Sequence, residues 1–253
     1  MFVEAALNGL QARIEILERV IEIFTGLLPA PSLQEFWGGR GFRFEKPDVR
    51  HFCLLKAVRI VSALNAATEL SRLGYTQEMA SLMRIVSECT RHIEYVVDVD
   101  DDAKHQTNVQ NYLRDFFADT TRDVEAEIKG VLIREKLINE QLGKTLDKIA
   151  ALNGEVENRT PAAKLFHRSA RAISFYVHAR YPECMDLYGG RPGWFHLRGM
   201  RGTTKDRENL EILDTFITTA NTTFVIMVQA LGELREAVFR EPALARWYSE
   251  KVG

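Results

Sequence analysis

Apolar residues recur at every third or fourth position along most of the chain, and this spacing constrains the fold more than any other feature of the sequence. It gives a segment one apolar face only when the segment is a helix of 3.6 residues per turn. The first such stretch covers residues 2–28 and ends before Pro29 and Pro31, with apolar positions at Leu7, Leu10, Ile14, Leu17, Ile21 and Phe24. Because the alternation typical of strands is nearly absent, we expect an all-α protein, a multi-helix up-down bundle of long antiparallel helices without a significant sheet.

Residues that start and stop helices divide the chain further. Asp48 can cap the start of a helix that Gly74 ends, and Thr76 can cap the next one. Thr160 followed by Pro161 is the clearest start signal in the chain, because proline fits the first helical position without loss. Together these signals predict helices over residues 48–73, 76–97, 109–117, 122–152, 161–180 and 206–239, a short one at the C-terminus, and glycine-rich loops near 38–41 and 187–204.

The chain shows no internal repeat and no Pro- or Ser-rich linker. A length of 253 residues is enough to build one large hydrophobic core. We therefore expect a single helical domain over residues 1–253, in which residues 1–46 can pack separately from a core bundle formed by residues 47–253.

Composition favours a protein of the reducing cytoplasm. The three cysteines, Cys53, Cys89 and Cys184, are far apart and form no CxxC pair, which argues against a disulfide framework or a cysteine-rich zinc site. The N-terminal stretch has an acid at Glu4 and no basic run before its apolar residues, unlike a secretory signal. The longest uncharged stretch, residues 215–232, contains too many Thr, Asn and Gln residues for a membrane span, so we expect no membrane association.

Charge is distributed unevenly along the chain, although the net charge is only −2. The segment from Arg159 to Arg207 contains ten Lys or Arg residues against three acidic residues, whereas the rest of the chain contains 23 basic and 32 acidic residues. This polarity predicts an anionic partner for the basic segment.

The helix expected over residues 161–180 concentrates polar residues on one face. On a helical wheel with 100° between successive residues, this polar face contains Lys164, His167, Arg168, Arg171, Ser174 and His178. A guanidinium group binds phosphate in a bidentate manner, and an imidazole titrates near neutral pH and can transfer a proton. This face is therefore a candidate phosphate-binding or catalytic surface, and the alternative is an ordinary solvated or structurally paired face.

The loop that follows places cations beside aromatic rings. Its candidate anion-binding residues are Arg191, Trp194, His196, Arg198 and Arg201. Cations for phosphates and rings for base stacking are the side chains that a single-stranded nucleic acid requires. Packing into the bundle is the simpler role for Trp194 and Phe195, because aromatic side chains mostly bury area, and base stacking is the alternative.

Arg171 followed after six residues by His178, on a helix of an all-α protein, resembles the Arg-x(4–6)-His motif of the HEPN superfamily of helical ribonucleases and their inactive relatives. The same helix, with Ser174 and with the Arg84 and Glu88 pair upstream, is also similar to an uncharacterised bacterial family with an Arg-x-x-Ser-x-x-x-His signature. The HEPN resemblance implies metal-independent RNA cleavage by two facing protomers, as in a toxin or defence effector. In that case His178 acts as general acid or base and Arg171 stabilises the phosphate.

A second function remains open beside RNA binding or cleavage. In it the chain is a non-catalytic helical interaction module or dimer scaffold whose basic patch binds an acidic partner. We expect no metal and no cofactor, since Glu88 and His92 are not part of the repeated Glu-x-x-His pairs of di-iron bundles, and no phosphate-binding glycine loop is present. Arg84 and Glu88 are expected to form an intrahelical ion pair. We also expect a homo-oligomer.

Overall fold

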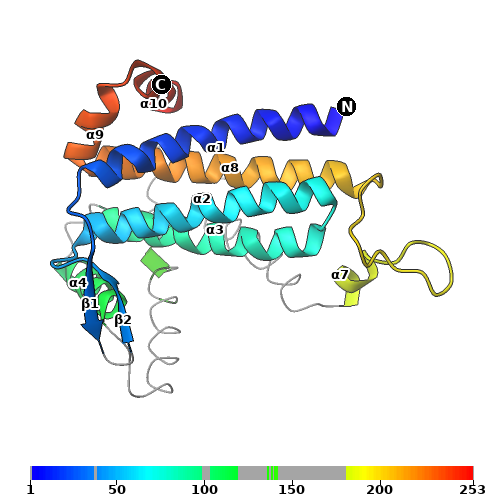
Figure 1. Cartoon of the computed structure of the whole chain (residues 1–253), viewed down its shortest axis with the longest axis horizontal. Coiled ribbons are helices and arrows are strands. Elements are labelled where there is room, and N and C mark those ends of the chain that lie inside the picture. The colour runs from blue at the N-terminus through cyan, green and yellow to red at the C-terminus, as the bar shows by residue number, and fades with distance from the viewer. Residues whose placement is uncertain are drawn as a thin grey trace, which may run out of the picture.

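The computed structural model of the chain describes residues 2–36, 39–98, 103–118, 136, 138, 140–141 and 181–252. Four long helices lie side by side and form the body of the molecule (Figure 1). They are α1 (Phe2–Gly26), α2 (Val49–Leu73), α3 (Thr76–Val97) and α8 (Lys205–Ala230), and the shorter helices are α4 (Ala103–Phe117), α7 (Tyr181–Met185), α9 (Gly232–Phe239) and α10 (Pro242–Val252). The all-α prediction is confirmed.

The apolar stripes predicted from the sequence form the core. On α1, five of the six predicted positions are buried, and the sixth, Ile21, packs against them. α1 contacts both α2 and α8, and α3 contacts α2 and α8, so all four long helices enclose one hydrophobic cluster. Phe52, Phe224 and Leu64 are among its fully buried side chains.

Two of the predicted helix boundaries are confirmed by cap geometry. The Asp48 carboxylate accepts hydrogen bonds from the backbone amides of Arg50 and His51, at 3.0 and 3.3 Å, and so caps α2. Gly74 ends α2 with a φ of 80°, a left-handed conformation that favours glycine. This turn makes α2 and α3 an antiparallel pair. It also contacts the loop before α8, because the Met200 amide donates a hydrogen bond to the Gly74 carbonyl at 2.8 Å.

Thr76 does not cap α3, contrary to the sequence prediction. The cap position is occupied by Tyr75, and Thr76 is the first helical residue, with its buried hydroxyl making no hydrogen bond to any described residue. The tight turn at Gly74 shifts the helix start by one residue, which a capping rule based on residue type cannot detect.

Residues near the first glycine-rich loop form a small antiparallel hairpin that the sequence did not predict. Strand β1 (Ser32–Phe36) pairs with β2 (Gly39–Arg43), with Ser32 opposite Arg43 and Phe36 opposite Gly39. The strands are only five residues long, and β2 itself contains Gly39 and Gly41, so the alternation was too short to outweigh these glycines.

The helix predicted over residues 206–239 is two helices. Leu231 adopts an extended conformation, with φ −103° and ψ 91°, and separates α8 from α9. Leu234 and Val238 are buried like the apolar residues of α8, so the apolar spacing continues across the break and conceals it. The predicted start of α4 at residue 109 is also late, because α4 begins at Ala103.

Candidate functional site

Residues 187–196, here called the tip loop, project beyond the end of the bundle (Figure 1). The loop folds back on itself through an antiparallel bridge between Tyr188 and Phe195. The Gly189 amide donates to the Trp194 carbonyl at 3.0 Å, and the His196 amide donates to the Leu187 carbonyl at 2.8 Å. These backbone bonds hold the tip loop in one conformation although it lies outside the core.

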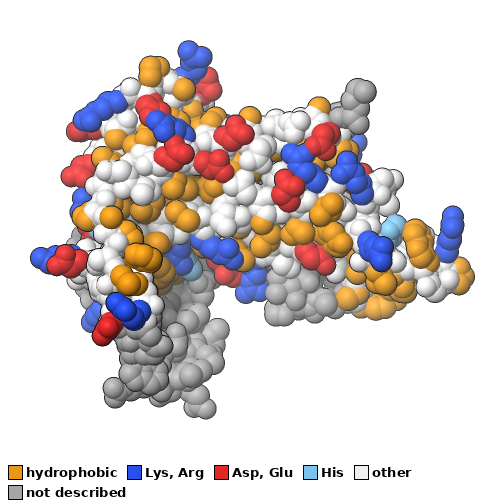
Figure 2. Space-filling view, in the orientation of Figure 1, with side chains coloured by type: hydrophobic (Ala, Val, Ile, Leu, Met, Phe, Trp, Pro, Cys, Tyr) orange, Lys and Arg blue, Asp and Glu red, His pale blue; other side chains and the backbone are white. Residues whose placement is uncertain are grey.

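Trp194 is the centre of a cluster of rings and cations in the tip loop. The Arg191 guanidinium carbon lies 5.8 Å from the Trp194 ring centroid, and the His196 ring lies 4.5 Å from it. The Tyr188 and Phe195 rings form a second pair at 5.5 Å. Figure 2 shows cationic, histidine and hydrophobic side chains together on this projection.

Trp194 and Phe195 do not pack into the bundle, contrary to the simpler role expected from the sequence. Trp194 is 46% exposed and Phe195 is 43% exposed. The bridge to Tyr188 directs this stretch away from the core, a long-range effect that residue type alone does not reveal. Both rings are accessible to a ligand.

Arg198 and Arg201, the other described members of the predicted anion-binding set, have different surroundings. Arg198 is exposed. Arg201 donates to the backbone carbonyl of Arg72 and lies 3.8 Å from the Glu4 carboxylate, so it connects the loop to the start of α1 and the end of α2. The predicted residues Lys164, His167, Arg168, Arg171, Ser174 and His178 lie outside the described residues.

Lys205 fastens the other side of the loop. Its ammonium group lies 3.2 Å from Asp186 and 2.6 Å from Glu208. Partial burial lowers the pKa of Lys205, but the hydrogen bonds to these two carboxylates outweigh this effect and raise it. Lys205 therefore remains charged and joins the start of α8 to the segment before the tip loop.

Arg84 and Glu88 form the ion pair that their spacing predicts, with Arg84 Nε 2.8 Å from Glu88 Oε1. Both side chains are partly exposed. An ion pair of this spacing stabilises a helix by about 0.3–0.5 kcal/mol. The role of Arg84 and Glu88 is therefore the local stabilisation of α3.

Sequence reasoning missed a partly buried polar pair between α3 and α8. The Thr223 hydroxyl donates to Glu94 Oε1 at 2.5 Å, and Arg91 lies one turn before Glu94 on α3. Burial raises the pKa of Glu94, whereas the Thr223 hydrogen bond and the charge of Arg91 oppose this shift. The signal that could have revealed the pair was an acidic residue among the apolar positions of residues 93–97.

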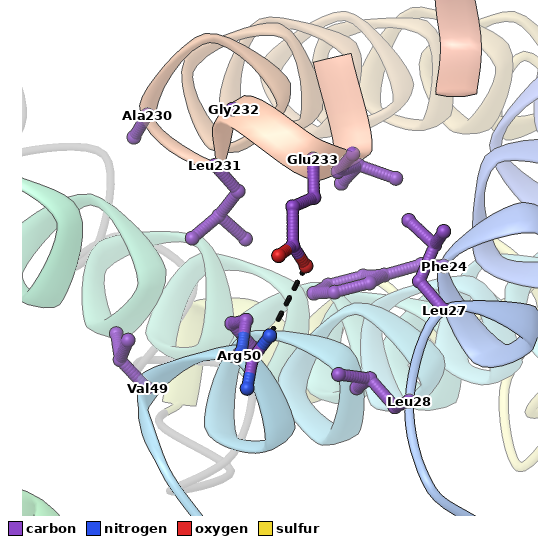
Figure 3. A pocket seen from close by; sticks show the side chains of 10 residues that line it. Phe24, Leu27, Leu28, Val49, Arg50, Ala230, Leu231, Gly232 and Glu233 are labelled. Atoms are coloured by element: carbon purple, nitrogen blue, oxygen red, sulfur yellow. Dashed lines mark hydrogen bonds and ion pairs between the residues drawn. The ribbon is translucent and has the colours of Figure 1, made fainter. Parts of the chain in front are cut away.

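A pocket of about 240 Å³ opens at the other end of the bundle, where α1 ends and α9 begins (Figure 3). Phe24, Leu28 and Leu231 contribute apolar walls. Arg50 and Glu233 point toward each other at its mouth, with Arg50 Nη1 3.1 Å from Glu233 Oε2, and Arg50 also pairs with Asp48. Because these carboxylates already neutralise Arg50, the pocket has no cation to attract an anionic ligand.

Among the described residues, no three His, Cys, Asp or Glu side chains are grouped in a way that could hold a metal ion. The helices in the described ranges include none long and apolar enough to cross a membrane. Comparison of the chain with family models, with curated proteins and with solved structures finds no match.

Proposed function

We propose that the protein binds single-stranded RNA through the tip loop. The observation that carries this proposal is the exposed Trp194 ring with Arg191 and His196 against it. An exposed ring can stack on any base, and cations beside it can contact the phosphates on either side of that base. The surrounding basic segment, with ten Lys or Arg against three acidic residues, supplies the long-range attraction.

The proposal extends to catalysis through the predicted helix over residues 161–180. In this form the protein is a HEPN-like, metal-independent ribonuclease, a toxin or defence effector of the cytoplasm. Arg171 binds the phosphate, His178 moves the 2′-hydroxyl proton, and Ser174 lies between them on the same helical face. What supports these roles is the resemblance to the HEPN motif and the chemistry of the two side chains.

RNA binding is tested with labelled single-stranded RNA and tRNA. Loss of one stacking ring costs about 1–3 kcal/mol, so Trp194→Ala should raise Kd roughly 5- to 150-fold, while Trp194→Phe should retain most of the affinity. The matched control is Phe239→Ala. Phe239 is 44% exposed and carries Arg235 at 5.8 Å from its ring, but it lies on α9, outside the basic segment. Equal affinity for all four proteins would contradict the proposal.

Cleavage is tested on the same RNAs in the presence of a chelator. Arg171→Ala and His178→Ala should both abolish cleavage, and His178→Ala should leave binding intact. Binding without cleavage in the wild type would leave the RNA-binding function and remove the catalytic one. Neither binding nor cleavage would favour the second candidate, a non-catalytic interaction module for an acidic protein.

A further inference from the structure

The outer face of α2 exposes apolar side chains beside charged ones. The opposite face packs in the core through residues such as Phe52 and Leu64. The outer face exposes a stripe whose successive members are four, three, four, three and four residues apart: Leu55, Arg59, Ser62, Ala66, Glu69 and Leu73. These steps average 3.6 residues, which is one helical turn, so the stripe follows a single face of α2 and can form a seam with a second helix. Figure 2 shows hydrophobic side chains over this part of the bundle, with charged side chains between them.

The stripe is complementary to itself when one copy is reversed. Two copies of α2 can lie antiparallel with a two-fold axis passing at the level of residue 64. A residue of one copy then lies opposite the residue of the other copy that is equally far from position 64 in the opposite direction along the helix. Leu55 then faces the partner's Leu73, Arg59 faces the partner's Glu69, and Ser62 faces the partner's Ala66. Each apolar residue meets an apolar one, each charge meets the opposite charge, and small residues meet at the centre.

We propose that a second copy of this chain docks antiparallel on α2 and forms a two-fold symmetric homodimer. A symmetric interface uses the same patch on both subunits and must be complementary to itself, and the α2 stripe meets this requirement. The small side chains of Ser62 and Ala66 let the two helix axes approach to roughly 8 Å, the close end of the usual range. From Leu55 to Leu73 the stripe runs about 27 Å at 1.5 Å per residue.

The charges of the stripe are available for a partner. Arg59 is exposed, and no carboxylate in the described ranges forms an ion pair with it. Glu69 lies 3.2 Å from Arg72 of its own helix, yet its side chain is 71% exposed. In the dimer the partner's Glu69 gives Arg59 a counter-charge, and the same pair forms a second time by symmetry.

The ends of the stripe are apolar and bury surface that the single chain exposes. Leu55 is 39% exposed and Leu73 is 55% exposed. Leu55 also forms part of the wall of a recess of about 510 Å³ together with Phe42, Phe44 and Phe116. The partner's Leu73 arrives beside this recess and covers it. Hydrophobic burial at both ends therefore adds to the two ion pairs.

The test exchanges the two charges and measures mass in solution by sedimentation equilibrium. The wild type should be a dimer. Arg59→Glu places two like-charge pairs in the dimer, and so does Glu69→Arg, so each variant alone should raise the dimer Kd at least about tenfold. An equal mixture of the two variants should recover the dimer, because each variant then supplies the charge that the other needs.

The control is Arg246→Glu, which reverses an exposed cation on α10 and should leave the dimer unchanged. Circular dichroism checks that every variant keeps its helices. A monomeric wild type would overturn the proposal, and so would a dimer that neither charge reversal weakens or two weakened variants whose mixture stays monomeric. RNA binding by Trp194 does not depend on these residues, so the two proposals can fail separately.

Discussion

Thr223 on α8 donates a hydrogen bond of 2.5 Å to Glu94 on α3 and so joins two core helices through a pair of polar side chains. Burial raises the pKa of Glu94, which means that the folded protein favours the neutral carboxyl group. The hydroxyl bond and the nearby charge of Arg91 reduce this preference without reversing it.

Glu94→Gln should raise the free energy of unfolding at neutral pH. Because the pKa of Glu94 is higher in the folded protein than in the unfolded chain, protonation of Glu94 stabilises the folded state fully when the pH is below its ordinary pKa of 4.5. This contribution is lost as the pH rises through the pKa of the folded state. Glutamine keeps an acceptor for Thr223 but cannot become charged. Urea unfolding of both proteins across this pH range should show a decline in stability with rising pH that is smaller in the variant. Glu250→Gln, at an exposed position of α10, serves as control, and a less stable Glu94→Gln at neutral pH would contradict the prediction.

Asp48 should contribute to stability through its cap and through its charge, and two substitutions separate these effects. Asp48→Ala removes both and should cost about 0.5–2 kcal/mol at neutral pH. Partial burial raises the pKa of Asp48, but hydrogen bonds from Arg50 and His51 outweigh it and lower the pKa from 3.8 to about 2. The charge contribution is therefore present above the unfolded pKa and is lost as pH falls through the folded pKa.

Asp48→Asn should keep the cap and lose only the part that depends on pH. Its unfolding free energy should fall less than that of the wild type when the pH is lowered from 3.8 to about 2. Acid unfolding followed by circular dichroism compares the two proteins. Parallel curves in this range would show that the carboxylate charge contributes nothing.

Gly189 should control the position of Trp194. A Cβ atom at Gly189 would lie 1.9 Å from Trp194 Cε3, so the ring must move to admit an alanine. Gly189→Ala is expected to weaken RNA binding as much as Trp194→Ala, with little change in Tm because the tip loop lies outside the core. Gly232→Ala is the matched control, since a Cβ atom there meets nothing within 4 Å. An unchanged affinity of Gly189→Ala for RNA would show that RNA binding does not depend on the position of the Trp194 ring.

Gly199 should anchor the loop before α8 to the turn between α2 and α3. Its φ is +86°, and a Cβ atom would lie 2.2 Å from the Leu73 carbonyl oxygen. Gly202 has a similar φ of +82° but nothing within 4 Å, so Gly202→Ala measures the backbone strain alone, about 1–2 kcal/mol. Gly199→Ala should cost more than this and should speed hydrogen exchange of the Met200 amide, which donates to Gly74. Equal effects of the two substitutions would refute the anchoring role.

The tip loop shows how far the candidate site could be predicted from the chain alone. The grouping of Arg191, Trp194 and His196 within six residues indicated a cation and ring cluster, because residues so near in sequence must be near in space. Their exposure could not be predicted, since it depends on the bridge between Tyr188 and Phe195 and on the contacts of Arg201 with the start of α1 and the end of α2.

The sequence by itself determined the helical class, the core face of α1, and the cap and end of α2 at Asp48 and Gly74. These features follow from hydrogen bonds and side-chain spacing within one or two helical turns. Only the tertiary structure decided that Leu231 interrupts a continuous apolar pattern and that Thr223 meets Glu94 across 129 residues. The physical reason is that such contacts arise from the packing of whole helices against one another, and a local pattern records which face is apolar but not which partner it meets.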